Sequence, residues 1–213
     1  MDESGVITSL ASVAAGSPLV SPDIFSGVAP ETEIVVVKLK ECKQYLRDFY
    51  LVPPEVPAYQ ENDIMMGVSY LFALANQYNT PLVICLALGT NMGSHTGTSS
   101  LSTFLNEMST FPGTAFVIAA GNETGYGHHY RGSTAPGTKT HEIELNVGDS
   151  THGFSMEFWA QNTAVYTLSF RSPSGEIMEG LTLRNRDADV LRFLLEGTEI
   201  TVYSRIVSNA SGS

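Results

Sequence analysis

The stretch from Thr114 to Glu123, with the sequence TAFVIAAGNE, decides the fold class of the first part of the chain. An apolar run leads into small residues and then leaves through Gly121 and Asn122. A second apolar run covers Pro81 to Leu88, and Leu101 to Met108 between them has helical spacing with an N-cap among the residues from Thr98 to Ser100. Two apolar strands around one helix predict a parallel sheet with helices on both faces.

Further predicted strands and helices of the same α/β pattern lie upstream. The β-branched run from Glu33 to Leu39 predicts another strand, and the stretch from Tyr59 to Tyr78 repeats apolar residues every three or four positions, as an amphipathic helix does. Leu10 to Ala15 predicts a short helix that Gly16 ends. Together these elements predict an α/β domain over residues 1–136.

After about Pro136 the hydrophobic period changes from helical to alternating. Period-two runs at 143–147, 154–158, 166–170 and 200–206 are separated by turn residues. Short alternating strands at this spacing are typical of an antiparallel sandwich or jelly roll. The sequence therefore predicts a second, β-rich domain over residues 137–213.

Composition excludes several function classes. With 11 Lys and Arg against 22 Asp and Glu, the net charge of −11 leaves no basic surface for nucleic acid. No apolar run approaches the ~20 residues of a spanning helix, and no signal-peptide layout is visible, so we expect no membrane partner and a cytoplasmic protein. Cys42 and Cys85 suggest neither a disulfide framework nor a metal site, and Cys85 is expected to be a buried, inert thiol.

Chemistry in an open parallel sheet gathers beyond the carboxyl ends of its strands. Asn122 leaves such an end and could aim its amide N–H at a developing oxyanion, although spacing alone favours an Asn that serves the turn. His128 and His129 could suggest a metal, but no acidic or thiol partner has ligand spacing. We expect these histidines to bond within their loop, His95 to be a packing or rim residue, and the protein to need no metal or cofactor.

Three segments in order resemble the subtilases, the subtilisin-type serine peptidases. Gly27 to Lys38 resembles the family's G-V-A-P stretch and following strand. Ile84 to Gly89 resembles its I-N-M-S-L-G strand, and Phe116 to Glu123 resembles its V-V-A-A-A-G-N-E strand. The stretches 59–64, 88–95 and 127–130, with a β-rich segment directly after the Asn, resemble the clostridial germination-protease subgroup.

The resemblance implies a partial subtilisin-like fold followed by an inserted jelly roll, and peptide-bond hydrolysis through an acyl-enzyme on a peptide or protein substrate. It implies that Asn122 belongs to the oxyanion hole. It also implies that the substrate lies along two segments: Ala87, Leu88 and Gly89 would pair with the extended peptide, while Ala119, Ala120 and Gly121 would line the specificity pocket.

The remaining catalytic positions are not in these 213 residues. Val6 stands where the family's G-H-G-T segment has its His, and neither the D-(S/T)-G segment nor the G-T-S-x-A segment occurs. We therefore expect an internal fragment that is inactive and self-associates when isolated. Two alternatives are a pseudoprotease that acts as a binding or regulatory partner, for example in spore germination, and a stand-alone binding module.

Overall fold

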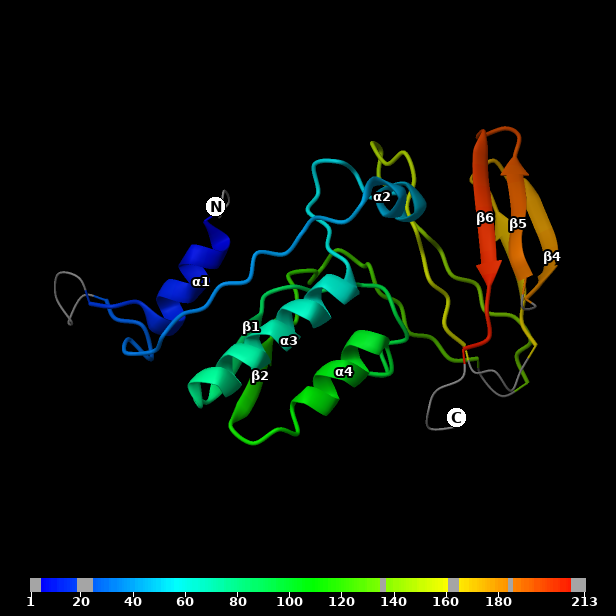
Figure 1. Cartoon of the computed structure of the whole chain (residues 1–213). Helices are drawn as coiled ribbons and strands as arrows, with labels where there is room; N and C mark the ends of the chain where they lie inside the picture. Colours follow the sequence, from blue (N-terminus) through cyan, green and yellow to red (C-terminus); the bar gives the residue numbers. More distant parts are fainter. Residues whose placement is uncertain (1–4, 19–24, 135–136, 161–164, 184–185, 208–213) are drawn as a thin grey trace. The chain divides into compact units, whose positions relative to one another are not determined.

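The computed structural model describes residues 5–18, 25–134, 137–160, 165–183 and 186–207. By its internal contacts the chain divides into two units, Met1–Glu157 and Phe158–Ser213 (Figure 1). Pro136, the last residue of the predicted first domain, lies outside the described residues, and the predicted domains 1–136 and 137–213 remain predictions.

The first unit contains the parallel pair that the sequence predicts. Strands β1 (Leu82–Leu86) and β2 (Thr114–Ile118) pair in parallel, with Leu82 opposite Thr114 and Leu86 opposite Ile118. The crossover between them carries helix α4 (Ser100–Met108), and the long helix α3 (Glu61–Tyr78) precedes β1 (Figure 1). As expected, Ser99 caps α4, because its Oγ accepts the Ser102 N–H at 3.1 Å.

The core of this unit lies between the two helices and one face of the pair. Val68 and Phe72 from α3, Ile84 from β1 and Leu105 from α4 are all buried, and Val68 is only 2% exposed. The Phe72 ring stacks on Phe116 of β2 at a centroid distance of 6.3 Å. The helical repeat in α3 therefore fulfils the role that its sequence predicts, since its apolar positions form the layer that covers the sheet.

The opposite face of β1 and β2 corrects two expectations. Among the described residues the pair is covered on one face only, because Val83 is 69% and Val117 is 57% exposed. Cys85 is exposed as well, not buried. Side chains alternate along a strand, so with Ile84 turned into the core its neighbours Val83 and Cys85 point to the open face.

Upstream of α3, the predicted helix forms and the predicted strand does not. Helix α1 (Val6–Ala15) forms where a helix is predicted and ends at Gly16. The predicted strand 33–39 has no strand pairing within the described residues, although Val37 and Leu39 lie against Gly67 of α3. Its extended, apolar character matches a strand, but a strand also needs a neighbour to share its backbone hydrogen bonds.

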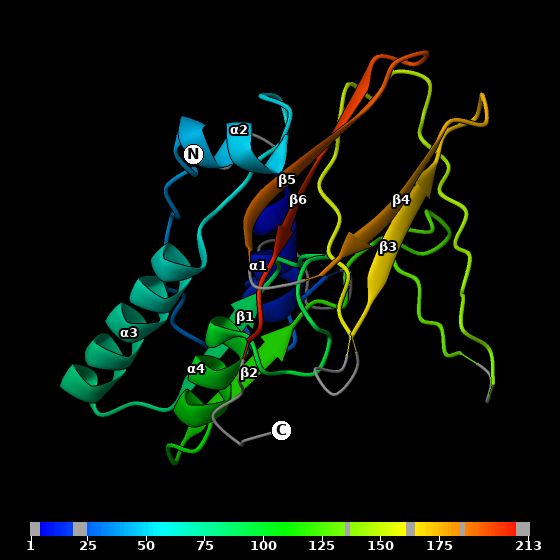
Figure 2. The same ribbon diagram turned by 90° about the vertical axis from the view of Figure 1, so that its right-hand side faces the viewer.

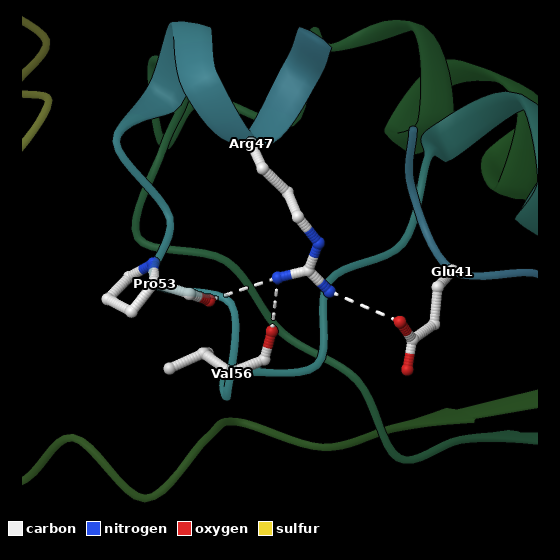
Figure 3. A network of polar contacts seen from close by, with 4 residues as sticks. All are labelled: Glu41, Arg47, Pro53 and Val56. Atoms are coloured by element: carbon white, nitrogen blue, oxygen red, sulfur yellow. Dashed lines mark hydrogen bonds and ion pairs between the residues drawn. The ribbon is translucent and has the colours of Figure 1, made fainter. Parts of the chain in front are cut away.

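Helix α2 (Gln44–Tyr50) is not evident from the sequence pattern. Its Arg47 is 6% exposed and donates from Nη1 to two carbonyl oxygens, that of Pro53 at 3.0 Å and that of Val56 at 2.7 Å (Figure 3). Its Nη2 pairs with the exposed Glu41 carboxylate at 3.4 Å. The guanidinium thus ties the proline-rich loop after α2 to the helix itself.

The second unit consists of two antiparallel pairs (Figure 2). β3 (Thr167–Arg171) pairs with β4 (Ile177–Thr182), and β5 (Arg186–Phe193) pairs with β6 (Thr198–Ser204). The predicted strand runs 166–170 and 200–206 are therefore confirmed over 167–170 and 200–204, while Tyr166 and Ile206 lie just outside β3 and β6. Runs 143–147 and 154–158 are not strands, and their apolar side chains, such as Ile143 and Phe154, are exposed without a partner strand in the described part of the chain.

Two carboxylates join the turns of these hairpins. Glu176 accepts the backbone N–H groups of Leu194 and Leu195 at 3.2 and 3.0 Å, and Glu196 accepts that of Ser174 at 3.0 Å. Hydrogen bonds, that from the Ser174 side chain first, lower the pKa of Glu196 from 4.5 to about 2. These reciprocal bonds connect the β3–β4 turn to the β5–β6 turn.

Candidate functional site

The candidate site lies at the carboxyl end of the parallel pair. Because β1 and β2 run in the same direction, the segments that follow them leave the sheet at the same end, which we call its carboxyl edge. The Ala119 N–H donates to the Leu86 carbonyl at 3.0 Å, which extends the pairing past the end of β2. The structure thus brings together the two segments that the sequence selects, Ala87, Leu88 and Gly89 after β1 and Ala119, Ala120 and Gly121 after β2.

Asn122 lies just past this edge and is exposed. Gly121 before it has φ +90°, a left-handed conformation that glycine adopts without steric cost and that turns the chain out of the strand. Within the described residues no hydrogen bond holds the Asn122 side chain, so its amide is not used to stabilise the turn. The amide N–H is therefore available to an external acceptor.

The loop after β1 is held by side chains near and far in sequence. Thr90 Oγ1 accepts the Met92 N–H at 3.1 Å, and the Glu157 carboxylate accepts the Gly93 N–H at 2.6 Å. His95, which has φ +55°, bonds through Nδ1 to the Gly93 carbonyl at 2.9 Å. Sequence reasoning missed Glu157, because 64 residues separate it from Gly93 and it belongs to no motif.

The loop after β2 contains the two adjacent histidines. His128 bonds to the Glu123 carboxylate at 2.5 Å and stacks on Tyr126 at a centroid distance of 5.7 Å. The His129 ring lies 4.4 Å, centroid to centroid, from that of His95 in the other loop. In the part of the chain that the structure describes, no three His, Cys, Asp or Glu side chains are grouped to hold a metal ion.

Two further observations concern Val6 and membrane-spanning helices. Val6, which the motif resemblance sets against the catalytic His of the subtilases, is the first residue of α1 and is 55% exposed. Among the described residues no helix is both long and apolar enough to cross a bilayer.

Comparison with known proteins finds a similar architecture in a protease. The parallel pair with its helices and the antiparallel pairs that follow correspond to part of a subtilase-like protease. One similar structure is that of the Clostridium perfringens CspB protease, with a TM-score of 0.71 and 26% identity over 91% of this chain. This confirms the resemblance to the clostridial subtilases that the sequence motifs indicate.

The chain spans 38% of the length of the CspB chain. No protein-family model matches the chain, and no curated protein matches it.

Proposed function

We propose that this chain is a section of a subtilase-type serine endopeptidase and supplies one wall of the substrate cleft together with an oxyanion-hole donor. The observation that carries the proposal is the parallel register of β1 and β2, which brings Ala87–Gly89 and Ala119–Asn122 to one edge of the sheet. The match to the CspB protease supports it at the level of the family.

Each segment has a distinct role in this proposal. Ala87, Leu88 and Gly89 offer backbone groups to an extended peptide, which would add to the sheet edge as a further strand. Ala119, Ala120 and Gly121 carry small or no side chains and leave room for a substrate side chain. Asn122 donates its amide N–H to the carbonyl oxygen as that oxygen becomes an oxyanion in the tetrahedral intermediate.

The 213 residues taken alone should not hydrolyse peptides. Acyl transfer needs a nucleophile and a base, and an oxyanion donor only stabilises charge that a nucleophile has generated. Val6 replaces the base, and no G-T-S-x-A segment is present in the sequence. Hydrolysis of a casein substrate by the purified chain, retained in an Asn122→Ala variant, would refute this assignment.

The decisive experiment starts from the gene that encodes this chain. If the reading frame around it encodes the D-(S/T)-G, G-H-G-T and G-T-S-x-A segments, the longer protein should cleave peptides. Asn122→Ala should then lower kcat about 100- to 1000-fold with little change in KM, a magnitude taken from subtilisin itself and not from this structure. Asn146→Ala, at an exposed Asn outside the described helices and strands, is the matched control and should leave kcat unchanged.

A second candidate function rests on Val6. If the reading frame is intact but the His, Asp or Ser positions are replaced, we propose a pseudoprotease that binds peptides at the same edge without cleaving them. Binding of an extended peptide that Asn122→Ala leaves unchanged, with no turnover in the parent protein, would favour this alternative.

A further inference from the structure

Both backbone polar groups of Gly93 are held by side chains, its N–H by the distant Glu157 and its carbonyl oxygen by the nearby His95. The Glu157 carboxylate accepts its N–H at 2.6 Å, a short distance typical of a charge-assisted hydrogen bond. The His95 Nδ1 lies 2.9 Å from its carbonyl oxygen. A carbonyl can only accept, so Nδ1 carries the proton in this contact and Nε2 is left for other partners.

His95 also connects the two loops of the candidate site. Its ring lies 4.4 Å from the His129 ring, and His129 follows Asn122 in the loop after β2. Its φ of +55° is uncommon for a residue other than glycine, and the bond from its ring to Gly93 accompanies that conformation. The contacts thus run without interruption from Glu157 through Gly93 and His95 to His129.

We propose that Glu157 and His95 are positioning residues that hold the loop after β1 against the loop that carries Asn122. The inference rests on the proposed function, in which the first loop continues the substrate-binding wall and the second carries the oxyanion donor. An oxyanion donor acts only at the position that the reacting oxygen will occupy, so the separation of the two loops decides whether a bound peptide meets Asn122.

We call the contacts that link Glu157, Gly93, His95 and His129 the clamp. It can be tested in the 213-residue chain by a measurement that does not depend on peptide hydrolysis. In ¹H–¹⁵N spectra, Glu157→Ala should increase the exchange rate of the Gly93 amide about tenfold or more and shift the resonances of Asn122 and His129. Glu157→Gln keeps an acceptor oxygen and should restore most of the protection. Glu144→Ala, at an exposed carboxylate of the segment 141–148, is the matched control and should change none of these signals.

A His95 variant separates the contact between Glu157 and Gly93 from the contact between His95 and His129. Asn tolerates left-handed backbone and has an amide donor, so His95→Asn should keep Gly93 protected while removing the ring that faces His129. We therefore expect shifts at Asn122 and His129 with little change at Gly93. Changes that stay within the loop after β1 in both the Glu157 and the His95 variants would overturn the proposal.

In the longer protein, a positioning role predicts a specific kinetic pattern. Glu157→Ala should raise KM several-fold, while kcat at saturating peptide falls much less than it does in Asn122→Ala, and Glu157→Gln should restore most of the KM. Equal losses in both parameters, with the folded fraction unchanged, would contradict positioning through the substrate wall. If the longer protein does not cleave peptides at all, the proposed function fails, and the spectra still decide whether the clamp exists.

Discussion

Arg47 offers the most direct test of how the first unit is held together. Arg47→Met retains the apolar stem of the side chain and removes the guanidinium that donates to the Pro53 and Val56 carbonyls (Figure 3). Hydrogen bonds from charged donors contribute about 1.5–3 kcal/mol each, so two bonds amount to roughly 3–6 kcal/mol. Water can reach part of this exposed loop in the variant, so we expect a loss of about 2–3 kcal/mol.

The ion pair adds little to this figure. The Glu41 side chain is 67% exposed and lies 3.4 Å from Nη2, and exposed pairs of this kind contribute about 0–1 kcal/mol. Glu41→Gln is therefore the matched control and should change the free energy of loop opening by less than 1 kcal/mol. Arg47→Lys keeps the charge but lacks the fork that reaches both carbonyls, and its cost should fall between those of the other two variants.

Native-state hydrogen exchange measures this loss locally. The Cys42 N–H, bonded to the Ala58 carbonyl at 2.8 Å, and the Val56 N–H, bonded to that of Pro53 at 3.1 Å, report on the loop. A loss of about 2–3 kcal/mol corresponds to exchange roughly 30- to 150-fold faster, since each 1.4 kcal/mol is a factor of ten. Unchanged exchange at both amides in Arg47→Met would refute the reasoning.

Three further outcomes are expected. Because bonding lowers the pKa of Glu196 to about 2, the second unit should lose stability as pH falls from about 4.5 towards 2; Glu196→Gln should flatten this dependence in acid titrations followed by circular dichroism. Phe72→Ala should destabilise the first unit by about 3–5 kcal/mol in urea, whereas Tyr70→Ala on the exposed side of α3 should cost far less. The isolated chain should self-associate in sedimentation experiments, and Val117→Glu on the open sheet face should shift it towards the monomer.

Local signals predict local structure well in this chain. The helix α3 and the Ser99 N-cap of α4 are predicted correctly, because each signal depends on residues only a few positions apart in the sequence. The parallel pair follows from two apolar runs around a helix. The candidate site follows in turn, since parallel strands end at one edge.

Expectations failed where the partner was not local. Segment 33–39 has the composition of a strand, yet composition says nothing of which neighbour will accept its hydrogen bonds. Cys85 shares an apolar run with Ile84, and the run alone does not tell which face a helix covers. β4 went unnoticed because Gly180, with φ +85° at an irregularity in the pairing, interrupts the alternation that identifies a strand.

Glu157 and Arg47 belong to a further class that sequence patterns do not reveal. Each is a single charged residue whose role depends on backbone groups brought near it by the fold. A lone Glu or Arg is compatible with any exposed position, so its partners emerge only from the coordinates.

The contrast between the parallel pair and the two hairpins has a kinetic consequence. β3 with β4 and β5 with β6 join through short turns, and such pairs form on a microsecond timescale of about 1–10 μs. β1 must wait until the crossover that carries α4 has closed before it meets β2, and contacts between residues far apart in sequence slow folding. In a refolding experiment the hairpins should therefore gain protection first, and the strand ends that carry Gly89 and Asn122 should be among the last parts of the chain to become ordered.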